Sequence, residues 1–231
     1  MNVMIIGGTS GIGLGLARHY LGLGARVAVC GRDPSKVDAP LRAQFVTYEL
    51  DIAERAKVDA AVEDFARGGL DLLIVSAGFY TADPALAQRM MATNVHGLMH
   101  AFDAGARRMR PGAQLAAIAS VAGLIRDYPG ASLYSANKRT VIALCELYRK
   151  TLKGIDVSVI VPGYVDTARL RELSGGDASH KPFLVSEARA VEIIARAIAA
   201  RRDKVVFPWQ LHWMIRAFNL LPVSLRRLRR K

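Results

Sequence analysis

The sequence has little of what marks secreted or metal-binding proteins. It contains two cysteines in 231 residues, and both Cys30, at the end of a strand-like run, and Cys145, in a helical pattern, are expected to be reduced core thiols. Its five histidines have no metal-ligand spacing, so we expect no metal site. The first apolar run has no basic stretch before it and no cleavage site after it, which favours a cytoplasmic protein.

The apolar runs that are present alternate with helical patterns. They lie at residues 2–6, 27–30, 71–76, 114–119, 155–161 and 204–207. This alternation predicts an α/β fold with a doubly wound parallel sheet of the Rossmann type, covered by helices on both faces. We find no repeat and no interdomain linker, and expect one catalytic domain of residues 1–207 followed by an apolar and basic extension of residues 208–231.

A glycine-rich loop follows the first predicted strand. Gly7, Gly11 and Gly13 separate the run 2–6 from a helical pattern, which gives the order strand, loop, helix. In such a unit one glycine makes the turn, one lets the backbone approach a pyrophosphate, and one lets the helix pack closely. The spacing differs from the commoner G-x-G-x-x-G pattern, and a tight turn with no ligand is the alternative.

Tyr134 and Lys138 form a second pattern, four residues apart in a helical segment. That spacing puts a phenol and an ammonium on one face of a helix. A phenol has an ordinary pKa of about 10, and a nearby positive charge favours the phenolate. We therefore expect Lys138 to lower the pKa of Tyr134 toward the range in which it can exchange a proton with a substrate.

Together these residues resemble the short-chain dehydrogenase/reductase family over about residues 2–207. The resemblance implies a catalytic set of Asn94, Ser120, Tyr134 and Lys138. Asp51 would contact the adenine, and Thr167 the nicotinamide amide. The expected cofactor contacts are Gly7, Thr9, Ser10, Gly11, Ile12, Gly13, Arg32, Asp51, Ile52, Ala77, Gly78, Tyr134, Lys138, Pro162, Gly163, Val165 and Thr167.

The chain departs from the family pattern in three places. Residues 75–78 read Val-Ser-Ala-Gly where the family usually has Asn-Asn-Ala-Gly, and Ile6 replaces a threonine. The segment from Ser120 to Tyr134 is one residue longer, near Arg126 and Asp127. None of these departures removes an expected catalytic group.

The resemblance implies hydride transfer between a nicotinamide and a carbonyl or alcohol carbon. Tyr134 would be the general acid or base, Ser120 would hold the substrate oxygen, and Lys138 would bind the ribose. Asn94 would hold a water that links Lys138 to solvent. Each has a structural alternative: Ser120 as a turn cap, Asn94 bonding its own helix backbone, Tyr134 as a half-buried ring, and Lys138 as an exposed charge.

The end of the second strand bears on cofactor choice. Gly31 occupies the position where a carboxylate would select NAD, and Arg32 follows with a guanidinium suited to a 2′-phosphate. This favours NADP (NADPH). In the alternative, Asp33 would reach the ribose and select NAD, although its place before Pro34 suggests that it starts a helix.

The net charge of +12 is concentrated near the C-terminus. After Asp203 there is no acidic residue, and the apolar stretch 207–222 is too short and polar to span a bilayer, which needs about 20 apolar residues. It could cover the substrate mouth, pack on another subunit, or touch an anionic membrane surface peripherally. No nucleic-acid module is present, and we expect no nucleic-acid partner. The basic residues are Lys204, Arg216, Arg226, Arg227, Arg229, Arg230 and Lys231.

The resemblance also implies a homodimer or homotetramer, built on the helices that carry Asn94 and Tyr134. Candidate contacts are among Met99, Ala101, Phe102, Val141, Leu144 and Tyr148, although ordinary core packing explains the same residues. The segment 168–186 would select a small or lipophilic substrate, with glycines 175 and 176 in a mobile lid. Two rival functions are a non-catalytic dinucleotide sensor or scaffold, and a membrane-surface protein acting through its basic tail.

Overall fold

The computed structural model describes residues 1–126 and 133–222. Its centre is a seven-stranded sheet in the order β3-β2-β1-β4-β5-β6-β9, with every neighbouring pair parallel. The strands are β1 (Asn2–Ile6), β2 (Arg26–Gly31), β3 (Val46–Glu49), β4 (Leu70–Val75), β5 (Met109–Ile118), β6 (Asp156–Pro162) and β9 (Lys204–Phe207). A separate parallel pair joins β7 (Val165–Asp166) to β8 (Val185–Ser186).

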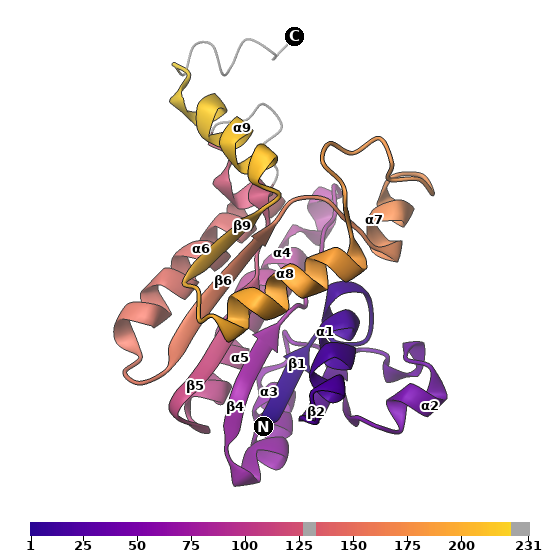
Figure 1. Ribbon diagram of the computed structural model, residues 1–231, viewed down its shortest axis with the longest axis vertical. Coiled ribbons are helices and arrows are strands. Elements are labelled where there is room, and N and C mark those ends of the chain that lie inside the picture. Colours follow the sequence, from indigo (N-terminus) through magenta and orange to yellow (C-terminus); the bar gives the residue numbers. More distant parts are fainter. Residues whose placement is uncertain (127–132, 223–231) are drawn as a thin grey trace.

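Helices cover both faces of this sheet (Figure 1), as the alternating sequence pattern predicts. Their bounds are α1 (Gly11–Gly22), α2 (Ala39–Arg42), α3 (Arg55–Phe65), α4 (Ala87–Met91), α5 (Gly97–Ala106), α6 (Leu133–Thr151), α7 (Ala168–Leu173), α8 (Glu187–Ala199) and α9 (Trp209–Leu220). Short 3-10 turns are η1 (Pro34–Lys36), η2 (Ala66–Gly68), η3 (Pro84–Leu86) and η5 (Val121–Leu124), and η4 (Ala92–His96) is a π-helical stretch that continues α4 into α5.

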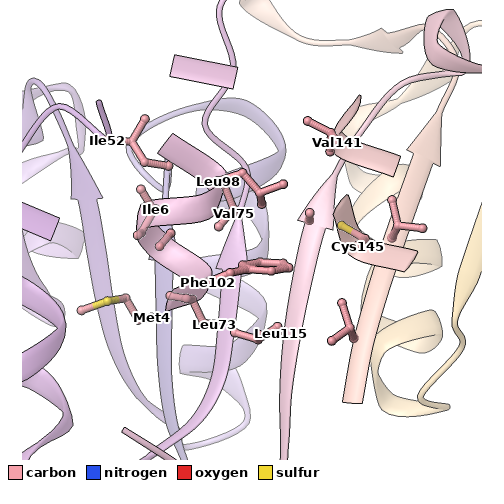
Figure 2. Packing of buried hydrophobic residues seen from close by; sticks show 14 of the residues in the cluster. Met4, Ile6, Ile52, Leu73, Val75, Leu98, Phe102, Leu115, Val141 and Cys145 are labelled. Carbon is pink, nitrogen blue, oxygen red and sulfur yellow. The ribbon is translucent and has the colours of Figure 1, made fainter. Parts of the chain in front are cut away.

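The two faces hold separate hydrophobic clusters. Alternate residues of β1 enter different clusters: Met4 and Ile6 pack with α3, α5 and α6, whereas Val3 and Ile5 pack with α1 and α8. Figure 2 shows the first cluster, with Phe102 among strand residues. Because both faces are covered, a central strand needs apolar residues at successive positions, which produces the continuous runs in the sequence.

The edge strand β3 lies outside the six apolar runs. Its side chains alternate between half-buried and exposed, and Val46 and Tyr48 pack against the first cluster. The two cysteines are free and buried, as expected, and burial raises the pKa of each thiol to about 12. Among residues 1–126 and 133–222, no helix is long and apolar enough to cross a membrane.

Three of the candidate subunit contacts belong to the core of the same chain. Ala101, Phe102 and Val141 are at most 3% exposed, so of the two interpretations core packing holds for them and a contact with another subunit does not. Their helices are apolar on more than one side, and the sequence pattern therefore does not distinguish the inner face from the outer one. The outer faces of α5 and α6 present Met99 and Leu147, which are 37% and 55% exposed.

Candidate active site

The glycine loop lies where the chain order of the sheet reverses, between β1 and β4. Gly7 has a left-handed φ of 86°, and a Cβ at this residue would stand 2.3 Å from the backbone nitrogen of Ala77. A Cβ at Gly13 would stand 2.0 Å from the carbonyl oxygen of Gly7. Both distances are shorter than any van der Waals contact, so the close packing of these loops requires glycine at both positions. A crevice at such a reversal is where sheets of this kind bind ligands.

The N-terminus of α1 is suited to an anion. Ser10 precedes the helix in extended conformation, and its side chain makes no capping hydrogen bond. The first backbone N–H groups of a helix have no partner inside the helix, and they carry the positive end of its dipole. Gly11 has φ 51°, and a Cβ there would lie 3.4 Å from Cγ2 of Thr167. The loop after β1 therefore meets the segment after β6 at this helix end.

That second segment is held in place by backbone and side-chain bonds. The Gly163 N–H donates to the Phe207 carbonyl at 2.7 Å, directly after Pro162 ends β6. Val165 is buried in β7, and the Thr167 hydroxyl accepts from the Leu170 N–H at 3.2 Å, which caps α7. Of the predicted residues of this turn, the structure brings Thr167 to the glycine loop.

The end of β2 contacts the same loop. A Cβ at Gly31 would lie 2.7 Å from the Thr9 side chain, so a larger residue there would displace Thr9. Arg32 is exposed and has no hydrogen bond or ion pair with the part of the chain that the structure describes. The Asp33 carboxylate accepts from the backbone and hydroxyl of Ser35, which lowers its pKa and starts η1, as the sequence predicts.

Lys138 is the most unusual residue of the site, because its ammonium group is buried. The residue is 5% exposed, and its Nζ donates to the Ile118 carbonyl at 2.9 Å, at the end of β5. The same Nζ lies 5.8 Å from the centroid of the Tyr134 ring. Burial lowers the pKa of Lys138 to about 8, because the charged form loses its hydration. The alternative of an exposed charge is wrong.

The pKa of Tyr134 is raised, not lowered as the sequence predicts. Burial of the phenol is the largest cause, a hydrogen bond with Ser120 opposes it, and Tyr80 raises the pKa further. Burial disfavours the phenolate more than the surrounding groups stabilise it. The Tyr134 phenol therefore stays protonated at neutral pH. Ser120 has two contacts, because its Oγ also accepts from the Ala122 N–H at 3.2 Å and caps η5.

Asn94 holds the loop that follows β4. Its Nδ2 donates to the Phe79 carbonyl at 2.8 Å, and its Oδ1 accepts from the Phe79 N–H at 2.7 Å. The alternative in which Asn94 bonds its own helix is wrong, since this partner is 15 residues away. Asn94 lies in the π-helical stretch η4, a distortion that is frequent at functional sites. A Cβ at Gly78 would lie 3.4 Å from Lys138 Nζ and 3.6 Å from Asn94 Oδ1.

Two predicted cofactor contacts belong to a different neighbourhood. Asp51 follows β3 and accepts from the Ala53 N–H at 3.0 Å. Ile52 is buried against α5, where a Cβ at Gly97 would stand 2.7 Å from its side chain. Among the described residues, no hydrogen bond or ion pair joins either of them to the glycine loop. Their expected role at the adenine end of a dinucleotide stays a prediction.

Sequence reasoning missed two residues near the site, Tyr80 and Asn219. The Tyr80 ring packs edge-on against Tyr134, with centroids 5.2 Å apart, and its position two residues after Gly78 could have indicated this. Phe183, which belongs to the segment 168–186 expected to select the substrate, is exposed in a left-handed conformation, with φ 54°. Asn219 bonds the segment after Ser120 across more than 90 residues, which no local pattern reveals. Asp127 and the cluster Arg226, Arg227, Arg229, Arg230 and Lys231 lie outside the described residues.

Comparisons with known proteins agree with this arrangement. The family model described as short chain dehydrogenase matches residues 1–177. An uncharacterized oxidoreductase of Myxococcus xanthus (strain DK1622) is 32% identical over 249 residues, which cover 98% of this chain and 96% of that protein. The chain therefore belongs to the short-chain dehydrogenase/reductase family, and its function is that of an oxidoreductase.

Solved structures share the fold at low sequence identity. One titled short chain dehydrogenase/reductase family protein has a TM-score of 0.79 and 24% identity, and the match covers 89% of this chain and 94% of that one. Another, titled ElxO with NADP Bound, has a TM-score of 0.78 and 22% identity, with 89% and 96% covered. These similarities confirm the Rossmann-type fold that the sequence predicts.

Proposed function

We propose that this protein transfers hydride between NADP(H) and a carbonyl or alcohol carbon, with Tyr134 as the general acid or base. The observation that carries the proposal is the buried ammonium of Lys138 beside the Tyr134 phenol. A buried lysine destabilises a fold, and its charge serves no purpose in a purely structural core. Next to a proton donor and an anion-binding helix end, the same charge has a chemical use.

In the reducing direction each of the four residues has a separate role. When bound, the nicotinamide supplies the hydride. Tyr134, kept protonated by its burial, gives its proton to the carbonyl oxygen, and Ser120 donates a hydrogen bond to that oxygen. Lys138 uses one N–H on Ile118 and has two more for the ribose hydroxyls. Asn94 bonds Phe79 and so holds the segment next to Lys138 in place. The second N–H of its Nδ2 can bind a water, through which Lys138 and Tyr134 would regain a proton from solvent.

The cofactor fits the residues that surround the glycine loop. The uncapped start of α1 offers N–H groups to the pyrophosphate, and the glycines leave room for it. Arg32 is free to pair with a 2′-phosphate, whereas the Asp33 carboxylate, which an NAD ribose would need, is engaged by Ser35. These contacts support NADP over NAD.

The rim of the site favours an uncharged, apolar substrate. Tyr80, Tyr164, Leu173 and Phe183 expose between 36% and 46% of their surface around the crevice segments. The two cations of the substrate segment have partners: Arg171 pairs with Asp166 at 2.7 Å, and Lys181 Nζ lies 5.8 Å from the centroid of the Tyr164 ring. A small or lipophilic ketone, aldehyde or alcohol therefore suits this site better than a carboxylate.

The assembly and location are also part of this proposal. The exposed Met99 and Leu147 on the outer faces of α5 and α6 support a homodimer or homotetramer through these helices. We place the enzyme in the cytoplasm, consistent with two free thiols and an NADPH supply.

The test is a screen of carbonyl compounds with NADPH, followed by the Tyr134→Phe variant on any substrate found. Loss of the general acid should reduce the turnover rate by a factor of roughly 10²–10⁴ while NADPH binding is unchanged. Tyr148→Phe is the matched control, because Tyr148 lies on the same helix and bonds Asp103 outside the site. Full turnover by Tyr134→Phe would refute the assignment.

A further inference from the structure

The helix α9 has one face buried in the core and one apolar face exposed to solvent. Its inner side chains Leu211 and Ile215 are buried in the first core cluster, to which α6 also contributes. Its outer face exposes Trp209, Trp213 and Leu220, which are 68%, 58% and 86% exposed. These three are spaced by four and seven residues, which aligns them along one side of a helix. Figure 1 shows α9 projecting beyond the carboxyl ends of the strands.

An arginine lies against this apolar face, and the sequence that follows is strongly basic. The Arg216 guanidinium lies 5.1 Å from the centroid of the Trp213 ring. Residues 223–231, which the structure does not describe, add five basic residues and no acidic one. The sequence after Asp203 therefore carries seven basic residues and no acidic one. An exposed apolar helix face beside a cationic cluster matches the chemistry of an anionic lipid surface.

We propose that α9 docks through its outer face on an anionic membrane surface, to which the positive charge of the sequence after Asp203 attracts the protein. The helix would lie in the interface and would not cross it, because its 12 residues extend only about 18 Å, against a hydrocarbon core of about 30 Å. A second copy of the chain is a poorer partner, because it would bring two like-charged clusters together. Tryptophan and arginine are also residues that favour the headgroup level of a bilayer.

The docked helix would stand directly beside the active site. Asn219, on the last turn of α9, accepts from the Arg126 N–H at 2.9 Å and donates to the Leu124 carbonyl at 2.8 Å. Leu124 ends η5, the turn that Ser120 caps. At the other end of α9, a Cβ at Gly163 would lie 2.8 Å from the Leu211 side chain. The membrane would therefore meet the enzyme at its substrate side.

This placement narrows the substrate class. If the proposed reductase activity is correct, its substrate is a carbonyl or alcohol that dissolves in the bilayer and reaches Ser120 and Tyr134 from the lipid side. Membrane docking itself does not depend on that activity, and it can be measured without substrate or cofactor.

Tryptophan fluorescence can report docking without a label. Trp209 and Trp213 are the two tryptophans of the sequence, and both lie on the outer face of α9. We would titrate the full-length protein with phosphatidylcholine vesicles, with or without a minor fraction of phosphatidylglycerol, and follow tryptophan emission and co-sedimentation. Anionic vesicles should shift the emission to shorter wavelength, and brominated acyl chains should quench it. No shift and no sedimentation, or equal binding to neutral vesicles, would overturn the proposal.

Two double variants test whether the position of the positive charge matters for vesicle binding. Arg226→Gln with Arg227→Gln should weaken partitioning onto anionic vesicles roughly 30-fold, because each basic residue near such a surface contributes a factor of about five. The control Arg18→Gln with Arg42→Gln removes the same charge elsewhere and should leave binding within about twofold. Equal losses in both pairs would show that only net charge matters and would refute a docking face.

The apolar contact is tested by Leu220→Asp against Leu23→Asp, since both side chains are at least 66% exposed. Only Leu220→Asp should reduce vesicle binding. Light scattering on the free protein distinguishes the competing partner: self-association that Leu220→Asp abolishes, without vesicle binding, would assign this face to a second copy. All variants should bind NADPH like the parent protein, so a failure of docking and a failure of the proposed reductase function give different results.

Discussion

Replacing Lys138 with methionine should make the protein more stable at neutral pH. Burial lowers the pKa of this lysine from 10.5 to about 8. At about 1.36 kcal/mol for each pKa unit, keeping the ammonium charged in the folded protein costs about 3 kcal/mol. Methionine has a similar length and no charge, but it loses the hydrogen bond to Ile118, worth about 1 kcal/mol. The net gain in the free energy of unfolding should be about 2 kcal/mol.

The pH dependence of this gain follows from the direction of the shift. The native pKa is the lower one, so between about 8 and 10.5 the unfolded chain holds a proton that the folded chain has released. The cost of the buried charge is complete below pH 8, declines as pH rises through this window, and is absent above 10.5. The advantage of Lys138→Met should therefore shrink steadily as the buffer becomes alkaline.

The assay is urea unfolding followed by far-ultraviolet circular dichroism, at neutral pH and near the upper end of that window. Lys150→Met is the matched control, because Lys150 is an exposed lysine on the same helix, and it should change stability by less than about 0.5 kcal/mol. A Lys138→Met protein that is less stable than the parent at neutral pH, or a stability difference that does not vary with pH, would refute the reasoning. The variant should also lose turnover.

Three further predictions concern the glycine loop, the hydrophobic core and the proton of the Tyr134 phenol. Gly7→Ala places a methyl group 2.3 Å from the Ala77 nitrogen, so it should abolish NADPH binding or folding, as calorimetry and circular dichroism would show; normal binding would exclude close packing there. Phe102→Ala should cost about 3–5 kcal/mol in urea unfolding, while the exposed Phe183→Ala should cost under about 1 kcal/mol. Because the pKa of Tyr134 is raised, the alcohol oxidation rate should increase toward alkaline pH while the carbonyl reduction rate stays level near neutrality; oxidation fastest in acid would contradict this.

The sequence predicts the central strands well because both faces of the sheet are buried. The run 2–6 coincides with β1, and the run 71–76 overlaps the central strand β4 except for one residue at each end. The edge strand β3 is missed because its half-buried alternation leaves no continuous apolar run. For Phe102 the sequence leaves an interface and the core both open, because the helix pattern shows that a residue is apolar but not which neighbour covers it.

In the candidate site, too, the sequence predicts features that depend on local backbone geometry and misses those that depend on distant residues. The glycine loop is readable because the backbone geometry at Gly7 restricts the residue type itself. The raised pKa of Tyr134 is not readable, since it depends on how much water the folded chain excludes from the phenol. The bonds of Asn219 to Leu124 and Arg126 join segments far apart in sequence, and only the folded structure brings them together.

The most direct test of this account is calorimetric titration of the folded protein with NADPH and NADH, alongside the Arg32→Ala variant. We expect saturable binding of NADPH at one site per chain, in the micromolar range common for enzyme substrates, with NADH at least about tenfold weaker. Arg32→Ala should remove this difference by weakening NADPH alone, because its guanidinium would pair with the 2′-phosphate. A folded protein that binds neither nucleotide would contradict the proposed function.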